Sequence, residues 1–503
     1  MEFIGWTYDI AREQSPREEV LRETLRRSLE AGYNAIGFYL EHRFAYASAP
    51  WAAGQGCLEP ETVKSLTAEF NPQGLRIIPF LNTLGHMEGF IRSEGGRRLA
   101  EGPAEGSLQI CPSREECIKF ARGLVTDAMD AFDDEWVHLG GDETTQLGQC
   151  PVCAGRAEKI GKAGIYSEFF GPLCEWVLQK GRRPCLWGDM LIEHPEALEA
   201  MPKETVIFDW HYAHGPRASA QTFREKGFDV VCCPAVHTYD SAWCFLDLTR
   251  RNVDEHLQAA NDVGALGVCV TTWELSFFTN YPSVLPVIYS AGRRLAKGDD
   301  WNEALVEEGG DAYARAADIL GNRIPARSEF LRAGTWRQLR DRFVIRQDPF
   351  HLWRAWSEEA CGEAGDEILR LCDEAEQDLD ERHPLRFAID LHRVAVQWVR
   401  HVEEARNRYA ARDGVGCCKA LAAGAEGIHR LGDPLLQAWE EGGSRADPLR
   451  LVRLLQHIAE VTRRVSDLSR EMPEAGHLPA FETLTSPPFV PYDQAAWRTG
   501  RDT

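Results

Sequence analysis

Hydrophobic and polar positions change period repeatedly along the first part of the chain. Short apolar runs are typical of strands buried on both faces, and the segments between them repeat their apolar residues at helical spacing. In residues 18–30, for example, Leu21, Leu25 and Leu29 share one helix face, with Arg and Glu opposite. The apolar runs are Phe3–Tyr8, Ala35–Leu40, Leu75–Leu81, Trp136–Leu139, Pro184–Trp187, Thr205–Trp210, Asp229–Cys233 and Gly267–Thr272. Eight strands alternating with helices predict an α/β fold, a (β/α)8 TIM barrel over residues 1–298. A doubly wound open sheet is the competing topology, although it usually has only about six strands.

The pattern changes from about residue 299, where strand-like runs stop. Pro384 precedes a stripe that includes Leu391 and Trp398, and Asp447-Pro448, a good helix-starting pair, precedes a second stripe. Residues 299–503 are therefore expected to form an α-helical C-terminal domain, which packs on the barrel or serves as a homodimer interface. The tail from Ser486 is expected to be extended or frayed.

Charge and composition narrow the function. With 56 basic and 78 acidic residues the net charge is −22, which disfavours nucleic acid and anionic membranes as partners. No apolar stretch approaches the roughly 18 residues of a membrane span. The first residues lack a secretory leader, and the 15 cysteines are scattered through apolar segments, typical of reduced core thiols. We therefore expect a cytoplasmic protein.

The fourth apolar run ends in the segment most suggestive of chemistry, His138-Leu139-Gly140-Gly141-Asp142-Glu143. In a barrel, catalytic groups lie where strands end. When two carboxylates lie close together in an apolar site, their pKa values move apart. One of them can then keep a proton near neutral pH, as the general acid of a glycosidase requires. The simpler alternative is that both acids cap the next helix in solvent.

Aromatic residues favour the sugar interpretation. Later strands end at Trp187, Trp210 and Trp273, and the seventh is followed by Tyr239-Asp240. Flat apolar walls among a few polar groups suit a pyranose, whose C–H faces stack on indoles. Tryptophans are often simply core residues, but three at the same end of one barrel are less easily explained that way.

The segment from His138 to Glu143 resembles the signature of family 20 glycoside hydrolases, the β-N-acetylhexosaminidases. Asp9-Ile10-Ala11-Arg12 is similar to that family's first-strand motif, and Gly85-His86 is similar to its third-strand Pro-Gly-His. The aromatic residues follow in the family's order, and the resemblance covers roughly residues 1–295.

This resemblance implies an exo-acting, retaining mechanism without a cofactor or metal. Glu143 would be the general acid, and Asp142 would hold the N–H of the substrate's 2-acetamido group, whose oxygen attacks the anomeric carbon. The other implied roles concern substrate binding. Tyr239 and Asp240 would face the substrate, with Tyr239 donating to the acetamido oxygen, and Trp187 and Trp210 would enclose the acetamido methyl group. Trp273 would stack under the sugar ring, Arg12 and Glu274 would bind ring hydroxyls, and His86 and Glu41 would form a relay to the acid.

The sequence departs from the family pattern in three places. Pro79-Phe80-Leu81-Asn82 stands where Pro-Glu-Ile-Asp is usual, and Glu274 directly follows Trp273 instead of being spaced by one residue. The first strand starts at Phe3, so the usual N-terminal accessory domain is expected to be absent. These differences indicate a divergent branch.

The sequence offers two candidate metal sites. Cys150 and Cys153 form a Cys-x-x-Cys pair that could hold half of a zinc site completed by Cys111 and Cys117. Because no second such pair exists, the sequence favours free thiols.

A metal-dependent barrel enzyme is the second metal hypothesis, with a site built from His211, His214, His237, Asp189 and Asp240. Hydrogen bonding at the rim is the simpler reading of these residues, and no phosphate-binding or other cofactor motif is present.

Three functions remain, in this order. The first is a β-N-acetylhexosaminidase. The second is a barrel glycosidase for a sugar without an acetamido group, with Asp189 or Glu274 as nucleophile. The third is a sugar-binding protein without catalysis.

Overall fold

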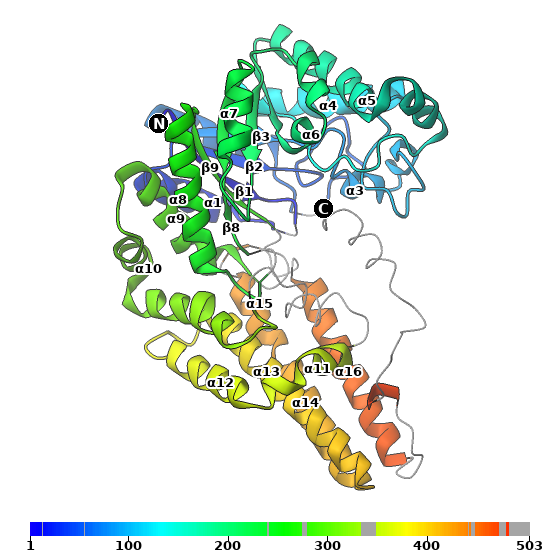
Figure 1. Cartoon of the computed structure of the whole chain (residues 1–503), viewed down its shortest axis with the longest axis vertical. Helices are drawn as coiled ribbons and strands as arrows, with labels where there is room; N and C mark the ends of the chain where they lie inside the picture. Colours follow the sequence, from blue (N-terminus) through cyan, green and yellow to red (C-terminus); the bar gives the residue numbers. More distant parts are fainter. Residues whose placement is uncertain are drawn as a thin grey trace.

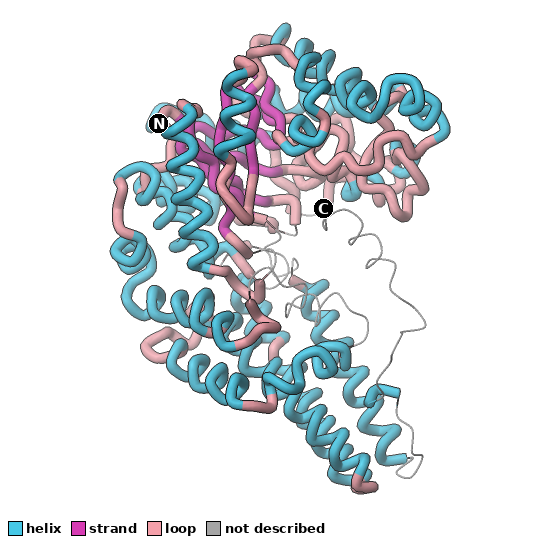
Figure 2. Tube along the Cα trace, viewed as in Figure 1, coloured by secondary structure: helices cyan, strands magenta, loops and turns pink. Residues whose placement is uncertain are grey.

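The computed structural model describes residues 1–12, 14–54, 56–238, 241–273, 279–332, 349–440, 442–443, 448–471 and 479–481. Figure 1 shows two parts, a strand-containing barrel that carries the N-terminus and an elongated array of helices below it. Coloured by secondary structure, all the strands lie in the first part (Figure 2).

The barrel consists of parallel strands in sequence order, closed by pairing of β1 with β9. The strands are β1 (Phe3–Asp9), β2 (Ala35–Tyr39), β3 (Arg76–Phe80), β4 (Trp136–His138), β5 (Arg183–Trp187), β6 (Val206–Trp210), β7 (Asp229–Cys233), β8 (Ala235–Val236) and β9 (Gly267–Thr272). The predicted TIM barrel is confirmed, and the bounds of its eight strands agree to one residue at each end. The short β8, which was not expected, continues the path of β7 after Pro234 and pairs with β9.

Helices follow the strands and cover the outside of the barrel (Figure 1). They are α1 (Glu18–Glu30), α2 (Pro60–Phe70), α3 (Glu88–Ile91), α4 (Glu115–Ala131), α5 (Pro151–Gln179), α6 (Asp189–Glu193), α7 (Arg217–Glu225), α8 (Leu246–Val263) and α9 (Tyr281–Lys297). The α1 residues predicted to face inward behave as expected, because Leu21 and Leu25 are almost fully buried. Gly161, with φ of 70°, kinks α5.

The barrel interior is a packed core and not a channel. Phe3 stacks on Trp136 with ring centroids 5.2 Å apart, and Phe80 stacks on His138 at 4.4 Å. Gly37 makes room for Phe80, because a Cβ atom at this position would overlap its ring. Aromatic side chains therefore fill the centre, and polar chemistry is confined to the open ends of the strands.

The second part is helical, as expected. It contains α10 (Trp301–Asp318), α11 (Phe350–Ala360), α12 (Glu363–Ala375), α13 (Arg386–Ala410), α14 (Gly414–Arg430), α15 (Gly432–Glu440) and α16 (Leu449–Glu471). The long helices α13, α14 and α16 pack side by side (Figure 1). The predicted stripe of α13 is buried at Leu391 and Trp398. The residues from Ser486 onward lie outside the described part.

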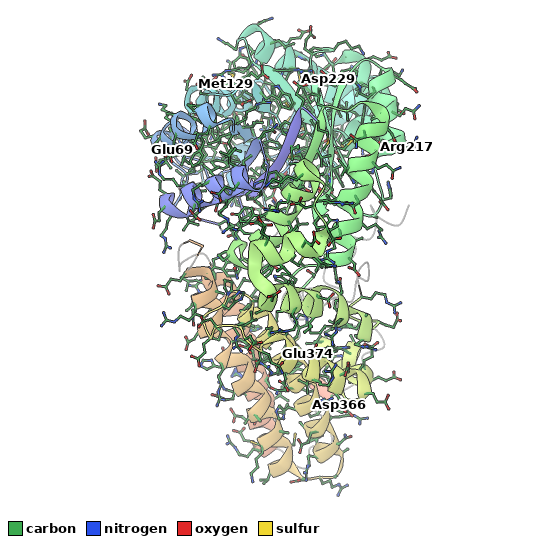
Figure 3. All side chains as sticks on the ribbon, turned by 90° about the vertical axis from the view of Figure 1, so that its left-hand side faces the viewer. Glu69, Met129, Arg217, Asp229, Asp366 and Glu374 are labelled. Atoms are coloured by element: carbon green, nitrogen blue, oxygen red, sulfur yellow. The ribbon has the colours of Figure 1, made fainter. Side chains whose placement is uncertain are left out.

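Polar contacts attach the helical part to the barrel. Arg27 of α1 pairs with Glu308 of α10 at 2.6 Å, and the Trp301 indole donates to Asp254 of α8 at 3.2 Å. Figure 3 shows the side chains of both parts, with Glu374 and Asp366 on the lower one. The boundary at residue 298 stays a prediction. Within the described ranges, no helix is both long and apolar enough to cross a membrane.

Candidate active site

Most of the predicted site residues come together at the carboxyl ends of the barrel strands. Arg12 follows β1, Glu41 follows β2, and His86 follows β3. Asp142 and Glu143 follow β4, and the remaining members are Trp187, Trp210 and Trp273 at the ends of β5, β6 and β9. Tyr239, Asp240 and Glu274 lie outside the described residues.

A glycine turn aims the two acids. Gly140 and Gly141 have φ of 78° and 95°, a region that residues with a Cβ rarely adopt. At Gly140 a Cβ atom would lie 2.7 Å from the carbonyl oxygen of Leu81, so the backbones approach too closely for any side chain. His138 is fully buried, which keeps its pKa well below the usual value, and its neutral ring accepts a hydrogen bond at Nδ1 from Gly140 N (3.1 Å).

The acid pair does not cap a helix. The next helix, α5, starts at Pro151, and its N-cap is Cys150, whose side chain accepts from Cys153 N. Asp142 and Glu143 lie seven or more residues earlier, in the loop that follows the glycine turn. The simpler alternative for these acids is therefore wrong.

His86 bridges the pair. Its Nε2 lies 3.2 Å from Asp142 Oδ2 and 3.4 Å from Glu143 Oε2. Burial by itself disfavours the charged ring, but the Asp142 and Glu143 carboxylates outweigh it and raise the pKa of His86 well above its usual value. The two carboxylates therefore favour the charged form of the His86 ring that lies between them.

Backbone strain concentrates at these same positions. Glu41, His86 and Glu143 have φ of 39°, 51° and 45°, three of the five positive values among non-glycine residues in the described part of the chain. Such conformations persist where surrounding contacts hold them, and they gather at functional sites. The strain is an independent observation that singles out residues after β2, β3 and β4.

Asp189 has a structural task that the sequence did not reveal. Its Oδ2 accepts from the backbone N–H of Glu143 at 2.9 Å, and its Oδ1 accepts from the Trp210 indole at 3.3 Å. Burial and the nearby Asp142 charge raise the pKa of Asp189 to about 8. Asp189 thus joins the acid loop to an aromatic wall.

The two acids differ in their surroundings. The Asp142 side chain is 15% exposed and that of Glu143 is 39% exposed. The Oδ1 atom of Asp142 is buried and accepts no hydrogen bond from the described residues. Asp142 therefore offers a free acceptor atom, whereas Glu143 faces solvent more openly.

Arg12, which follows β1, contacts acidic residues at the ends of β1 and β2. Its guanidinium pairs with Asp9 at 2.9 Å and lies 3.7 Å from Glu41. It also lies over the ring of Tyr39 at 5.2 Å and over that of Trp273 at 5.6 Å.

Glu41 and Glu88 flank His86. One ligand atom from each of the three side chains lies within 4.8 Å of the others. Burial raises the pKa of Glu41 to about 7, although Arg12 opposes this shift. These contacts fit the predicted relay of Glu41 and His86 behind the acid pair.

The tryptophans differ in exposure, because Trp187 is almost fully buried in the barrel core whereas Trp210 and Trp273 are partly buried against it. Trp187 and Trp273 meet edge to face with centroids 5.9 Å apart, and Trp210 stacks on Tyr212 at 4.9 Å. The Trp273 indole donates to the Tyr212 hydroxyl at 2.7 Å. Tyr212 was missed by the sequence analysis, although its spacing of two from Trp210 places it on the same side of an extended chain.

The proposed histidine metal centre does not form in the described part. His211 contacts Ser219 Oγ at 2.8 Å, His237 contacts the carbonyl of Tyr212 at 2.8 Å, and His214 contacts Gly215 O. No three of these histidines and Asp189 bring ligand atoms within 4.8 Å of one another in the described part, and Asp240 lies outside it.

Comparison with known proteins agrees with the geometry. Residues 44–275 match the family model for glycosyl hydrolase family 20, catalytic domain. A β-hexosaminidase of Akkermansia muciniphila is 25% identical over 213 residues, 39% of this chain and 40% of that relative. Hexosaminidase D of Bos taurus is 23% identical over 278 residues, 51% of this chain and 80% of that relative.

Solved structures share the fold. The structure of Flavobacterium johnsoniae chitobiase superposes with a TM-score of 0.51 at 15% identity, covering 93% of this chain and 71% of that one. The match to the Akkermansia relative spans less than half of its length.

Proposed function

The chain contains a family 20 glycoside hydrolase catalytic domain, and on that premise we propose that it is an exo-acting, retaining β-N-acetylhexosaminidase. It removes terminal β-linked N-acetylglucosamine or N-acetylgalactosamine. The 2-acetamido group of the sugar acts as the nucleophile, so no carboxylate of the protein bonds to the anomeric carbon.

Glu143 protonates the glycosidic oxygen as its bond to the anomeric carbon breaks, while the acetamido oxygen closes a five-membered oxazolinium ring on the other face. Water then attacks the anomeric carbon, Glu143 takes its proton, and the acetamido group is restored. The greater exposure of Glu143 supports this role, because the acid must reach both the leaving group and incoming water.

Asp142 accepts the acetamido N–H and stabilises the positive charge of the intermediate. Its buried Oδ1, which accepts no hydrogen bond from the described residues, is the observation that carries the proposal, because a substrate amide would supply the missing hydrogen bond. An intramolecular nucleophile held in this way starts with a high effective concentration.

The aromatic walls support a sugar in the same place. Trp187 and Trp210 box the acetamido methyl, and Trp273 lies under the ring, held by its bond to Tyr212. Tyr239, Asp240 and Glu274 are proposed to complete the contacts to the acetamido oxygen and the ring hydroxyls.

The test is hydrolysis of aryl β-N-acetylglucosaminide and β-N-acetylgalactosaminide by wild type, Asp142→Asn and Glu143→Gln. We expect wild type to cleave at least one, with inhibition by an acetamido-derived thiazoline. Glu143→Gln should lose most activity on a poor leaving group, and less on an activated one, which depends little on the acid. No cleavage of either substrate by wild type would reject the proposal.

The second candidate is a glycosidase with Asp189 or Glu274 as nucleophile. Asp189 is disfavoured because both of its oxygens already accept hydrogen bonds, and Glu274 lies outside the described residues. Cleavage of a simple β-glucoside or β-galactoside without thiazoline inhibition would favour it. Sugar binding in calorimetry without any turnover would favour a non-catalytic role. A cytoplasmic location and a homodimer through the helical part also stay proposals, the latter tested by sedimentation.

A further inference from the structure

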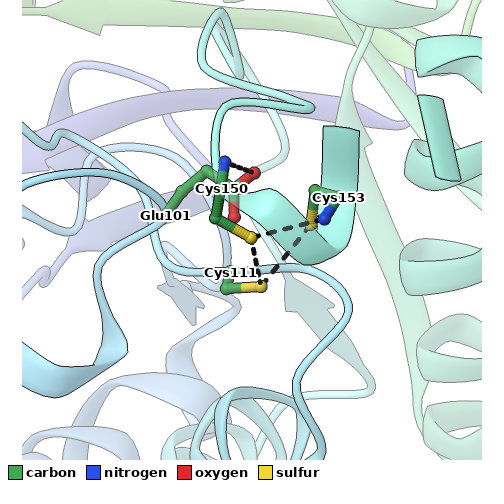
Figure 4. A group of neighbouring side chains, drawn as sticks. All are labelled: Glu101, Cys111, Cys150 and Cys153. Atoms are coloured by element: carbon green, nitrogen blue, oxygen red, sulfur yellow. Dashed lines mark hydrogen bonds between the residues drawn. The ribbon is translucent and has the colours of Figure 1, made fainter. Parts of the chain in front are cut away.

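A second group of polar side chains lies apart from the active site. The thiols of Cys111, Cys150 and Cys153 converge on the carboxylate of Glu101 (Figure 4). Cys111 Sγ lies 3.7 Å from Cys150 Sγ and 3.5 Å from Cys153 Sγ, and one ligand atom from each of the four residues lies within 4.8 Å of the others.

Two backbone devices build the group. The long connection between β3 and α4 folds back on itself, with Ala100 paired to Ile110 in an antiparallel bridge. Glu101 N donates to Gln109 O and Cys111 N donates to Leu99 O, both at 2.9 Å. Glu101 and Cys111 each follow a bridged residue, so their side chains lie on the same face of this pair.

The start of α5 supplies the other two thiols. Cys150 is the N-cap and Cys153 lies in the first turn, where the backbone N–H of Cys153 donates to Cys150 Sγ at 3.4 Å. The two side chains are thereby held beside each other, within reach of the Cys111 thiol.

The surroundings of Glu101 are independent evidence for a cation at this place. Its side chain is fully buried, Oε1 accepts from Cys150 N at 3.2 Å, and Oε2 has no hydrogen-bond partner in the described part. No cationic side chain of that part forms an ion pair with it. Buried carboxylates are normally paired with a cation or bound to a metal.

We propose that Glu101, Cys111, Cys150 and Cys153 bind one Zn²⁺ in a tetrahedral site. Bonds of about 2.3 Å from zinc to sulfur place tetrahedral sulfurs about 3.8 Å apart, close to the separations seen. Thiolate ligands select zinc over magnesium or calcium, and four protein ligands leave no open position for catalysis. The guanidinium of Arg114 beside Cys111 offsets part of the negative charge.

The site corrects the set that the sequence suggested. Cys117 was the fourth ligand of the zinc site that the sequence weighed against free thiols, but it lies on α4 and its thiol donates to Leu99 O at 3.5 Å. It is as deeply buried as Cys111 and Cys153 yet stands outside the group. Cys117 therefore provides a matched control.

The role of the zinc is to fasten a loop. It joins the β3–α4 connection to the start of α5, and the loop between β4 and α5 carries Asp142 and Glu143. Two further bonds reinforce this junction, from Gln146 N to Gln109 Oε1 (3.0 Å) and from Leu108 N to Gln146 Oε1 (2.8 Å). The ion holds the acid loop in position and takes no part in the reaction.

The test measures metal directly and does not depend on the proposed enzymatic activity. Full-length protein, purified under reducing conditions and dialysed against metal-free buffer, is analysed for zinc by mass spectrometry. We expect about one zinc per chain in wild type and in Cys117→Ser, and none in the double variant Cys150→Ser/Cys153→Ser. Glu101→Gln should bind zinc at least about tenfold more weakly.

Wild type alone decides the question if the variants do not fold. After zinc removal, added Co²⁺ should produce the visible bands of a tetrahedral thiolate site and be displaced by Zn²⁺. Absence of both bound zinc and cobalt bands would overturn the proposal. So would undiminished zinc in the double variant, or a disulfide among these cysteines in freshly purified wild type detected by intact mass.

Discussion

Replacing Asp142 by asparagine should lower the pKa of His86. At the 3.2 Å that separates His86 Nε2 from Asp142 Oδ2, opposite unit charges attract by about 5 kcal/mol at an effective dielectric constant of about 20. Because one pKa unit corresponds to about 1.4 kcal/mol, this energy sets a ceiling of about 4 units. Measured effects of a single opposite charge are smaller, and we expect a fall of about 1–3 units.

The shift is measured by NMR titration of the imidazole nitrogens, with the His86 signals identified by their loss in His86→Gln. Glu143→Gln is the matched comparison, because this carboxylate lies slightly farther away at 3.4 Å and is more exposed. It should therefore lower the pKa of His86 by less than Asp142→Asn does. A His86 pKa that does not change in Asp142→Asn, or falls more in Glu143→Gln, would refute the electrostatic account of the bridge.

The same ion pairs link stability to pH. The pKa of His86 is raised in the folded state, so its contribution to stability is fully present below the unfolded value near 6.5 and is lost as pH rises through the folded value. Asp142→Asn should reduce this contribution, which urea denaturation below and above neutral pH would reveal as a weaker pH dependence than in wild type.

Four other substitutions, one of them a control, probe the surroundings of the site. Asp189 has a folded pKa of about 8 against an ordinary value of 3.8, so ionising it costs folding energy. The unfolding free energy of wild type minus that of Asp189→Asn should therefore fall as the pH rises from about 4 to about 8. A difference in unfolding free energy that stays constant in urea titrations over this range would contradict the prediction. Gly85→Ala would place a Cβ atom 2.6 Å from a backbone oxygen of the acid loop, and should lower kcat at least about tenfold. Gly106→Ala, where a Cβ atom meets nothing, should leave kcat unchanged, and equal rates for the two variants would count against the packing argument. Tyr212→Phe removes the hydroxyl that accepts the hydrogen bond of the Trp273 indole at 2.7 Å, and it should lower kcat/KM by about 3- to 10-fold. An unchanged kcat/KM would show that this hydrogen bond does not position Trp273.

The helical part illustrates a limit of pattern reading. The apolar stripe of α13 was clear in the sequence, since Leu391 and Trp398 recur at helical spacing and are buried. Its packing partners were not, because any amphipathic helix can bury its stripe against several neighbours. Contacts such as that between Arg27 and Glu308 join residues 281 positions apart, and no local spacing encodes them.

The sequence by itself determined the barrel and the position of the acid pair. A strand buried on both faces must be apolar throughout, so each strand is visible as a short run, and Gly140-Gly141 before Asp142-Glu143 indicates a turn that aims side chains. These are local properties of the chain.

Only the tertiary structure decided which distant groups meet these residues. It placed His86 between the two acids, Asp189 beside the backbone N–H of Glu143, and Glu101 beside Cys111, Cys150 and Cys153. The physical reason is that two residues come within bonding distance through the packing of whole elements. For Glu101 the deciding element was an irregular connection whose single antiparallel bridge left no hydrophobic period to read.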